Sequence, residues 1–452
     1  MRVRKNHWMR PVLGLTLACV LETHAADMPL SGLPSSDVLP ASSEDMMATP
    51  ASDDAIADTA SGDTLAVSAV HETRWSVTAS LGAISSSGTG DLDDSGERAG
   101  AAARVQTEWT HGNWNALGEA VGGSSALAYD GATAIRQAWV DYAHGPVQLR
   151  VGRQVIAWGR ADRLNPTDNL SPRNLPALVA DIDADRMGLD ALSLRLQFGE
   201  RWTLGVVHAA RMPATVLPGA IADLPSQFGG RRVRDLSSSE NLDALKLDFA
   251  GYRLDASISA LEGPAPTSAF VATPLPAAYQ PKTRVLGADF SLTLGDRWAM
   301  RGEFAHTRFV DAAPAGLGDF RYAVLGIERH VDGGWLMLAQ YVYRNADRSP
   351  IQPLGAVNRA IWFQNEAKSD AVYLGLNRAR FERNLSGDIG VLQTLDDHGR
   401  AWFANLEYRL DDQWSILARL QTFSGPMSSN LGALRENSLL LLELRGTWGW
   451  LR

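Results

Sequence analysis

The chain has 452 residues, of which 45% are hydrophobic, and a formal net charge of −9 at pH 7. An acidic chain lacks the basic face that nucleic-acid phosphates require, so we exclude nucleic acid as a partner. No apolar run approaches the roughly 20 residues that a helical span needs, which excludes membrane crossing by helices.

The first 25 residues have the pattern of a secretory signal peptide. Four basic side chains within the first ten residues precede an apolar core at 11–21, and small residues follow near Ala25. We expect residues 1–25 to be cleaved during export. Cys19 is the only cysteine and would leave with this leader, so the exported chain would contain no disulfide.

Residues 26–72 differ from the rest of the chain in composition. They are rich in Ser, Ala and Pro and hold nine acidic residues but no Lys or Arg. Few large apolar side chains and one sign of charge cannot bury enough surface to offset chain entropy. We therefore predict an acidic, disordered periplasmic extension, with a plug domain as the alternative.

From Trp75 onward, segments of about ten residues alternate apolar and polar side chains, as transmembrane strands with two different faces do. LSLRLQF at 192–198 is an example. We expect eighteen such strands, at about 74–84, 98–110, 114–122, 134–143, 147–158, 188–198, 201–211, 242–250, 252–262, 283–294, 297–309, 319–330, 334–345, 370–382, 386–395, 400–410, 413–424 and 437–450.

The connections between these segments alternate between short and long. Turns such as 111–113 and 295–297 alternate with loops such as 159–187 and 212–241. Transmembrane barrels have short periplasmic turns and long outer loops. In lipid every backbone N–H and C=O needs a partner, so the strands must close into a barrel without edges. The sequence therefore predicts an all-β fold, in which residues 73–452 form a transmembrane antiparallel β-barrel of about 18 strands.

Tryptophans recur at equivalent places, just after short turns. Amphipathic aromatic rings settle where membrane meets water, so we predict an interface girdle at one barrel end. Ordinary core aromatics at strand starts are the alternative. The expected girdle residues are Trp114, Trp202, Trp298, Trp335 and Trp414.

The polar side chains of the alternating strands should face a water-filled lumen. They include Arg150, Arg195, Lys246, Arg253, Asp255, Arg301, Glu303, Glu407, Arg409, Arg419, Glu443 and Arg445. Such a charged wall would sort polar solutes, and its many arginines favour acidic ones. The alternative is that these side chains form cross-strand ion pairs that hold the wall together.

Eighteen strands, an Arg-rich wall and a long, charged third outer loop with WGRADRLNPTDNLSPRN resemble proteobacterial outer-membrane porins and alginate-export-type barrels. The resemblance implies that this loop, 159–187, bends inward and constricts the pore. Its turn-forming Asn, Pro and Ser residues should hold a defined shape. The expected constriction residues are Arg160, Asp162, Arg163, Asp168 and Arg173. A surface loop with internal ion pairs is the alternative.

Enzyme motifs are missing: GxSxG, HExxH, a phosphate-binding loop and the dinucleotide glycine pattern do not occur. Asp181, Asp183 and Asp185 begin like a calcium loop, but Arg186 stands where glycine should, so we predict no metal and no cofactor. The preferred hypothesis is an outer-membrane channel or exporter, set in outer-membrane lipid, for polar solutes or polysaccharide. The alternatives are a barrel that binds a periplasmic protein partner or lipid within an assembly, and a membrane-embedded hydrolase.

Overall fold

The computed structural model describes residues 73–88, 97–123, 135–161, 164–174, 186–217, 234–236, 240–272, 277–347 and 349–451, the last range without 351, 353, 363, 365, 383, 427–428, 430, 433–434 and 436–437. The expected signal peptide and the expected acidic extension at 26–72 lie outside the described residues. So do Asp162, Arg163 and the aspartates at 181, 183 and 185.

Eighteen long strands make one sheet. They are β1 (Thr73–Gly88), β2 (Glu97–His111), β3 (Trp114–Gly123), β4 (Ile135–His144), β5 (Val147–Gln154), β6 (Leu189–Phe198), β7 (Trp202–Ala209), β9 (Leu242–Ala250), β10 (Leu254–Pro264), β13 (Lys282–Leu294), β14 (Trp298–Phe309), β15 (Phe320–Val331), β16 (Trp335–Ala346), β17 (Lys368–Glu382), β18 (Leu385–Thr394), β19 (Arg400–Arg409), β20 (Trp414–Ser424) and β21 (Leu439–Leu451).

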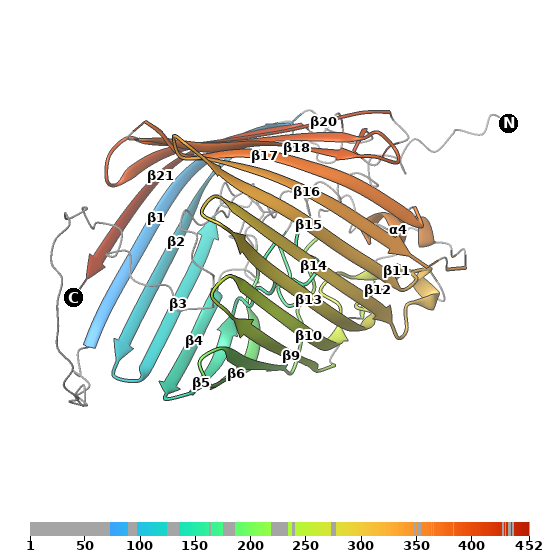
Figure 1. Cartoon of the computed structure of the whole chain (residues 1–452), viewed down its shortest axis with the longest axis horizontal. Helices are drawn as coiled ribbons and strands as arrows, with labels where there is room; N and C mark the ends of the chain where they lie inside the picture. The colour runs from blue at the N-terminus through green and yellow to red at the C-terminus, as the bar shows by residue number, and fades with distance from the viewer. Residues whose placement is uncertain are drawn as a thin grey trace.

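Each of these strands pairs in antiparallel fashion with the next one along the chain. Strand β1 also pairs with β21, from Ser76 opposite Leu451 to Gly88 opposite Leu439, and this pairing closes the ring. Figure 1 shows the blue N-terminal strands lying beside the red C-terminal strand. The predicted fold class is therefore confirmed, because eighteen antiparallel strands form a barrel without a free edge.

The fifth strand is shorter than expected. It ends at Gln154 and not at residue 158. Gly152 has a φ of 127°, and a Cβ there would overlap the carbonyl oxygen of Ala138, so only glycine fits. The Gln154 side-chain amide then donates to the carbonyl of Ala191 at 2.9 Å, and the chain leaves the wall after it.

The outer face of the wall is apolar over a height that suits a membrane. Leu192 and Phe198 on β6 are exposed on this face, whereas Ala191 faces inward and is buried. On β14, Trp298 and Arg308 both face outward, ten residues apart. At about 3.4 Å per residue and a tilt near 40°, they are about 26 Å apart along the barrel axis, close to the roughly 25 Å apolar band of outer-membrane barrels.

Elements that the sequence did not predict cover part of the long-loop end. They are β8 (Arg234–Leu236), β11 (Ala269–Val271), β12 (Ala277–Tyr279), η3 (Ala313–Ala315) and α4 (Gly355–Ile361). Asn358 of α4 is fully buried; it accepts from the N–H of Phe270 at 2.8 Å and donates to the carbonyls of Phe270 and Ala315, each at 2.7 Å. This side chain therefore ties three connections into one cap. Within the described part of the chain, no helix is long and apolar enough to span a membrane.

Candidate functional site

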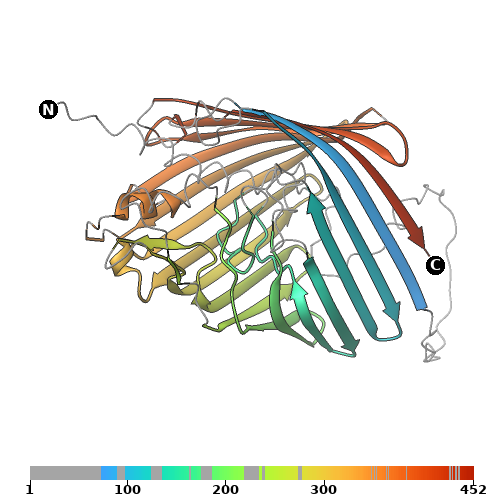
Figure 2. The ribbon, with the colours of Figure 1, turned by 180° about the vertical axis from the view of Figure 1, so that it is seen from behind.

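The connection between β5 and β6 enters the barrel and reaches the far wall. We call residues 155–161 and 164–174 the crossing segment. Its Trp158 and Leu170 pack with residues of β6, β7, β9 and β10, whereas Leu164 packs with residues of β15 to β20, among them Phe403. Figure 2 shows this connection as teal coil inside the ring of strands. The segment therefore crosses the lumen.

A single carboxylate on the wall holds the crossing segment. Glu303 on β14 is 4% exposed, and one of its oxygens accepts from the backbone N–H groups of Arg160 and Ala161. The other oxygen accepts from the N–H and the hydroxyl of Thr167, at 3.1 and 3.0 Å. Four donors of the crossing segment converge on one carboxyl group. Glu303 therefore anchors both sides of the turn at its tip.

The guanidinium of Arg160 points at the wall. It pairs with Asp289 on β13, and with Asp248 on β9 at 3.0 Å. Burial alone would lower the pKa of Arg160, but the Asp289 and Asp248 carboxylates outweigh it and raise the pKa above its usual value. Lys246 also pairs with Asp248, at 3.2 Å. The expected constriction residue Arg160 is thus a charged tether between the segment and the wall.

The segment also holds its own shape. Asn165 accepts from the N–H groups of Thr167 and Asp168, which forms a tight turn. Asp168 pairs with Arg186 at 2.8 Å and with Arg173 at 3.4 Å. Asp168 and Arg173, two of the expected constriction residues, lie together in the lumen with Arg186. The charges of these three side chains largely satisfy one another.

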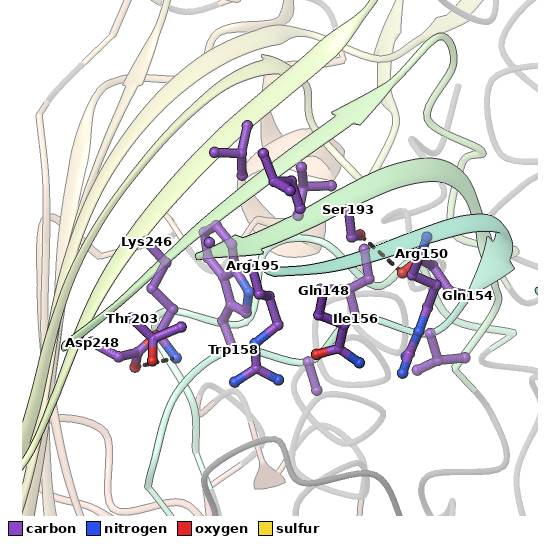
Figure 3. Close-up of a pocket in the computed structure, with 16 residues that line it drawn as sticks. Gln148, Arg150, Gln154, Ile156, Trp158, Ser193, Arg195, Thr203, Lys246 and Asp248 are labelled. Carbon is purple, nitrogen blue, oxygen red and sulfur yellow. Dashed lines mark hydrogen bonds and ion pairs between the residues drawn. The ribbon is translucent and has the colours of Figure 1, made fainter. Parts of the chain in front are cut away.

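A cavity of about 220 Å³ lies between the crossing segment and the wall of β5, β6, β7 and β9. We call it the inner chamber. Arg150, Arg195 and Lys246 line it from three strands, and Trp158 lines it from the crossing segment (Figure 3). Arg150 lies 3.8 Å over the ring of Trp139 and also pairs with the carboxylate of Asp141 at 3.3 Å. The chamber therefore has a polar wall that is lined by three cations and one carboxylate, Asp248.

A second cavity, of about 170 Å³, lies on the long-loop side of the segment. We call it the outer chamber. Phe320, Tyr322 and Trp362 give it aromatic walls, and Arg173 and Arg344 contribute cations. The Arg344 guanidinium stacks 4.6 Å from the Phe320 ring. Residues 165–173 of the crossing segment form its floor, so one segment separates the two chambers.

The remaining expected lumen residues are distributed along the wall. Arg301 pairs with Glu328 at 2.9 Å, and Arg445 with Glu443 at 2.7 Å. Asp255 accepts from the N–H of Gly251, Arg419 is buried, Glu407 is half-buried and Arg409 is exposed near the turn end. Arg253 is a correction: it lies exposed in the turn between β9 and β10, 5.9 Å from the Tyr252 ring, because the strand begins only at Leu254.

The five expected girdle tryptophans all face outward at the short-turn end, where three pack on a neighbouring ring. Trp114 lies 4.7 Å from Tyr142, Trp202 lies 5.0 Å from Phe249, and Trp414 lies 5.5 Å from Trp448. The roles that sequence reasoning missed are those of Glu303 as an anchor and of Trp158 as a chamber wall. No local signal marks either role. In the described ranges, no cluster of His, Cys, Asp and Glu could hold a metal ion.

The closed ring, the apolar exterior and the loop across the lumen define a β-barrel of the porin type. No protein-family model matches the chain, and no curated protein matches it in sequence. Among solved structures, OccK5 (OpdH) of Pseudomonas aeruginosa is 12% identical at a TM-score of 0.53, covering 84% of this chain and 98% of its own. OccAB2 of Acinetobacter baumannii is 12% identical at 0.55, covering 83% and 98%. A BenF-like porin of Pseudomonas fluorescens Pf-5 is 11% identical at 0.53, covering 84% and 99%. At this identity the likeness establishes the fold.

Proposed function

We propose that the protein is a passive outer-membrane channel for small polar solutes, preferentially anionic ones. The observation that carries the proposal is the inner chamber. Three strands bring Arg150, Arg195 and Lys246 to one cavity, where Asp141 pairs with Arg150 and Asp248 pairs with Lys246, so two carboxylates face three cations. A narrow site with excess positive charge attracts anions and repels cations. The porin-type fold supports an outer-membrane location. The protein would reach it by export, during which residues 1–25 are cleaved.

Selection depends on a constriction that keeps its shape. Glu303 on β14 and the Arg160 pairs with β9 and β13 hold the crossing segment against the wall, so that solutes must pass around a fixed obstacle. The chambers of about 220 and 170 Å³ suit small solutes better than a polysaccharide chain. Arg160, Asp168 and Arg173 act mainly as structural ties, and the wall residues of the inner chamber carry the selectivity.

Planar-bilayer recording of the purified full chain tests the proposal. We expect discrete channels whose reversal potential in a KCl gradient shows chloride preference. A variant without residues 159–187 should conduct more and discriminate less. Absence of conductance from both proteins would exclude a channel. A cation preference of the full chain would overturn the assignment of the inner chamber.

A further inference from the structure

The lipid-facing wall carries charged side chains near both ends of the barrel, but they are neutralised differently. At the long-loop end they form ion pairs across neighbouring strands. Arg153 pairs with Asp190 at 2.8 Å, and Arg284 pairs with Glu262 at 2.9 Å. Arg308 follows the same pattern, 3.5 Å from Asp319. This end therefore supplies its own counter-charges.

At the short-turn end, two outward arginines stack on girdle tryptophans. Arg329 on β15 lies 4.9 Å over the ring of Trp298, and Arg378 on β17 lies 5.0 Å over the ring of Trp335. Each arginine is the direct cross-strand partner of its tryptophan. The same arrangement is thus built twice on the four adjacent strands β14 to β17.

The neighbours of Arg329 that the structure describes on the outer face are apolar and supply no counter-charge. Its side chain is exposed, and Ile327 and Met337 beside it on the same face are 41% and 50% exposed apolar residues. In the part of the chain that the structure describes, Asp332 of the neighbouring turn pairs with Arg297 at 3.1 Å, and no carboxylate forms a salt bridge with Arg329. Stacking satisfies the flat face of a guanidinium, whereas the N–H groups at its edge are suited to two oxygens of one phosphate.

We propose that Arg329 with Trp298 forms a binding site for the phosphate group of an anionic phospholipid in the leaflet around the short-turn end. Tryptophan rings settle at the level of lipid headgroups, so the phosphates lie at the height of Arg329. Arg378 and Trp335 repeat the stacking, but the Nε–H group of Arg378 is buried, so this pair is not part of the proposed site.

A headgroup held at Arg329 would fix the depth of β14 and β15 in the membrane. The proposal does not depend on what passes through the lumen. A channel of any selectivity would keep this site, and a protein without conductance could still bind the lipid. The two proposals therefore fail independently.

Native mass spectrometry of the full chain in detergent tests the site. The protein is titrated with phosphatidylglycerol, with phosphatidylcholine and with inorganic phosphate. We expect phosphatidylglycerol to bind more tightly than phosphatidylcholine, and Arg329→Gln to weaken its binding about fivefold, the contribution of one basic residue near an anionic membrane. Arg284→Gln removes a lipid-facing arginine of the other end and serves as the matched control.

Equal binding of phosphatidylglycerol by Arg329→Gln and the unchanged protein would overturn the proposal. So would equal binding of the two lipids by the unchanged protein, a result that needs no variant. Displacement of lipid by inorganic phosphate at similar concentration would show a free-anion site instead. Arg329→Lys keeps the charge but loses the planar fork, and we expect it to lie between the unchanged protein and Arg329→Gln. Circular dichroism shows that each variant retains its barrel.

Discussion

The inner and outer chambers share the crossing segment as a partition, yet their walls are chemically different. The inner chamber is lined by polar side chains of strands, with Arg150, Arg195 and Lys246 among them. The outer chamber is lined by connections as well as strand ends, and aromatic rings form much of its wall. The inner chamber can therefore select solutes by their charge, and the outer chamber can select them by their apolar surface.

The difference follows from how each chamber is made. Strand alternation places every second side chain of β5, β6 and β9 in the lumen, so polar residues at those positions produce a polar wall. The outer chamber instead uses the apolar core beneath the cap, where Phe320 and Trp362 pack with residues of η3 and α4. Its aromatic surface belongs to the structure that holds the loops together.

The largest change in conductance should come from removing the crossing segment, which separates the two chambers. Glu303→Ala leaves the backbone N–H groups of Arg160 and Ala161 without their acceptor, at about 1–3 kcal/mol for each donor that stays buried. The N–H of Thr167 keeps only Asn165 as its acceptor. We expect the segment to leave the lumen, the chambers to merge and single-channel conductance to rise severalfold. Glu407→Ala, the same substitution at a half-buried wall residue, is the control. Unchanged conductance of Glu303→Ala would show that the segment has other sufficient anchors.

Reversing a charge in the inner chamber should change selectivity without changing pore size. Arg195→Glu alters the local charge by two units, which at about 1 kcal/mol per unit at contact distance in water amounts to about 2 kcal/mol, so the chloride-to-potassium permeability ratio should fall about 30-fold or more. Reversal potentials in a KCl gradient measure the ratio. Arg409→Glu, at an exposed position near the turn end, should leave it nearly unchanged. Equal effects of both variants would contradict a local inner-chamber filter.

Salt concentration should affect the inner and the outer chamber differently. Between about 0.1 and 1 M the screening length falls from about 10 to 3 Å, so the anion preference that comes from the inner chamber should weaken. Block by an aromatic sulfonate that binds the outer chamber should change less, because burial of apolar surface is not screened. Parallel loss of both properties would show that charge dominates in both chambers.

The smallest change in chloride preference is expected from Trp362→Ala. This change removes an outer-chamber wall and a ring contact with Phe309 at 5.1 Å, and loss of a buried Trp costs about 3–5 kcal/mol in the cap. We expect weaker block by the aromatic sulfonate and nearly unchanged chloride preference. Trp402→Ala changes a lipid-facing tryptophan that is 43% exposed, and it is the matched control. A large change in chloride preference would mean that the outer chamber also filters charge.

The strands and their faces could be predicted from the sequence because they depend on a local period of two. Leu192 is outward and Arg195 inward, as alternation requires. The exceptions occur where the period is interrupted. Arg136 is an extra residue at a register shift opposite Glu119, and this bulge brings it inward to pair with that carboxylate at 2.8 Å. Arg253 lies just before its strand begins.

The sequence by itself determined the barrel, its strand number and the order of short turns and long loops, because backbone pairing in lipid leaves few alternatives. It also marked 159–187 as the loop that enters the pore, through a family resemblance. Only the tertiary structure decided what the charges of that loop do. Arg160 and Glu303 are 143 residues apart in number, and their contact depends on closure of the ring across the lumen. No local pattern encodes such a contact, so residues expected to select solutes serve as tethers instead.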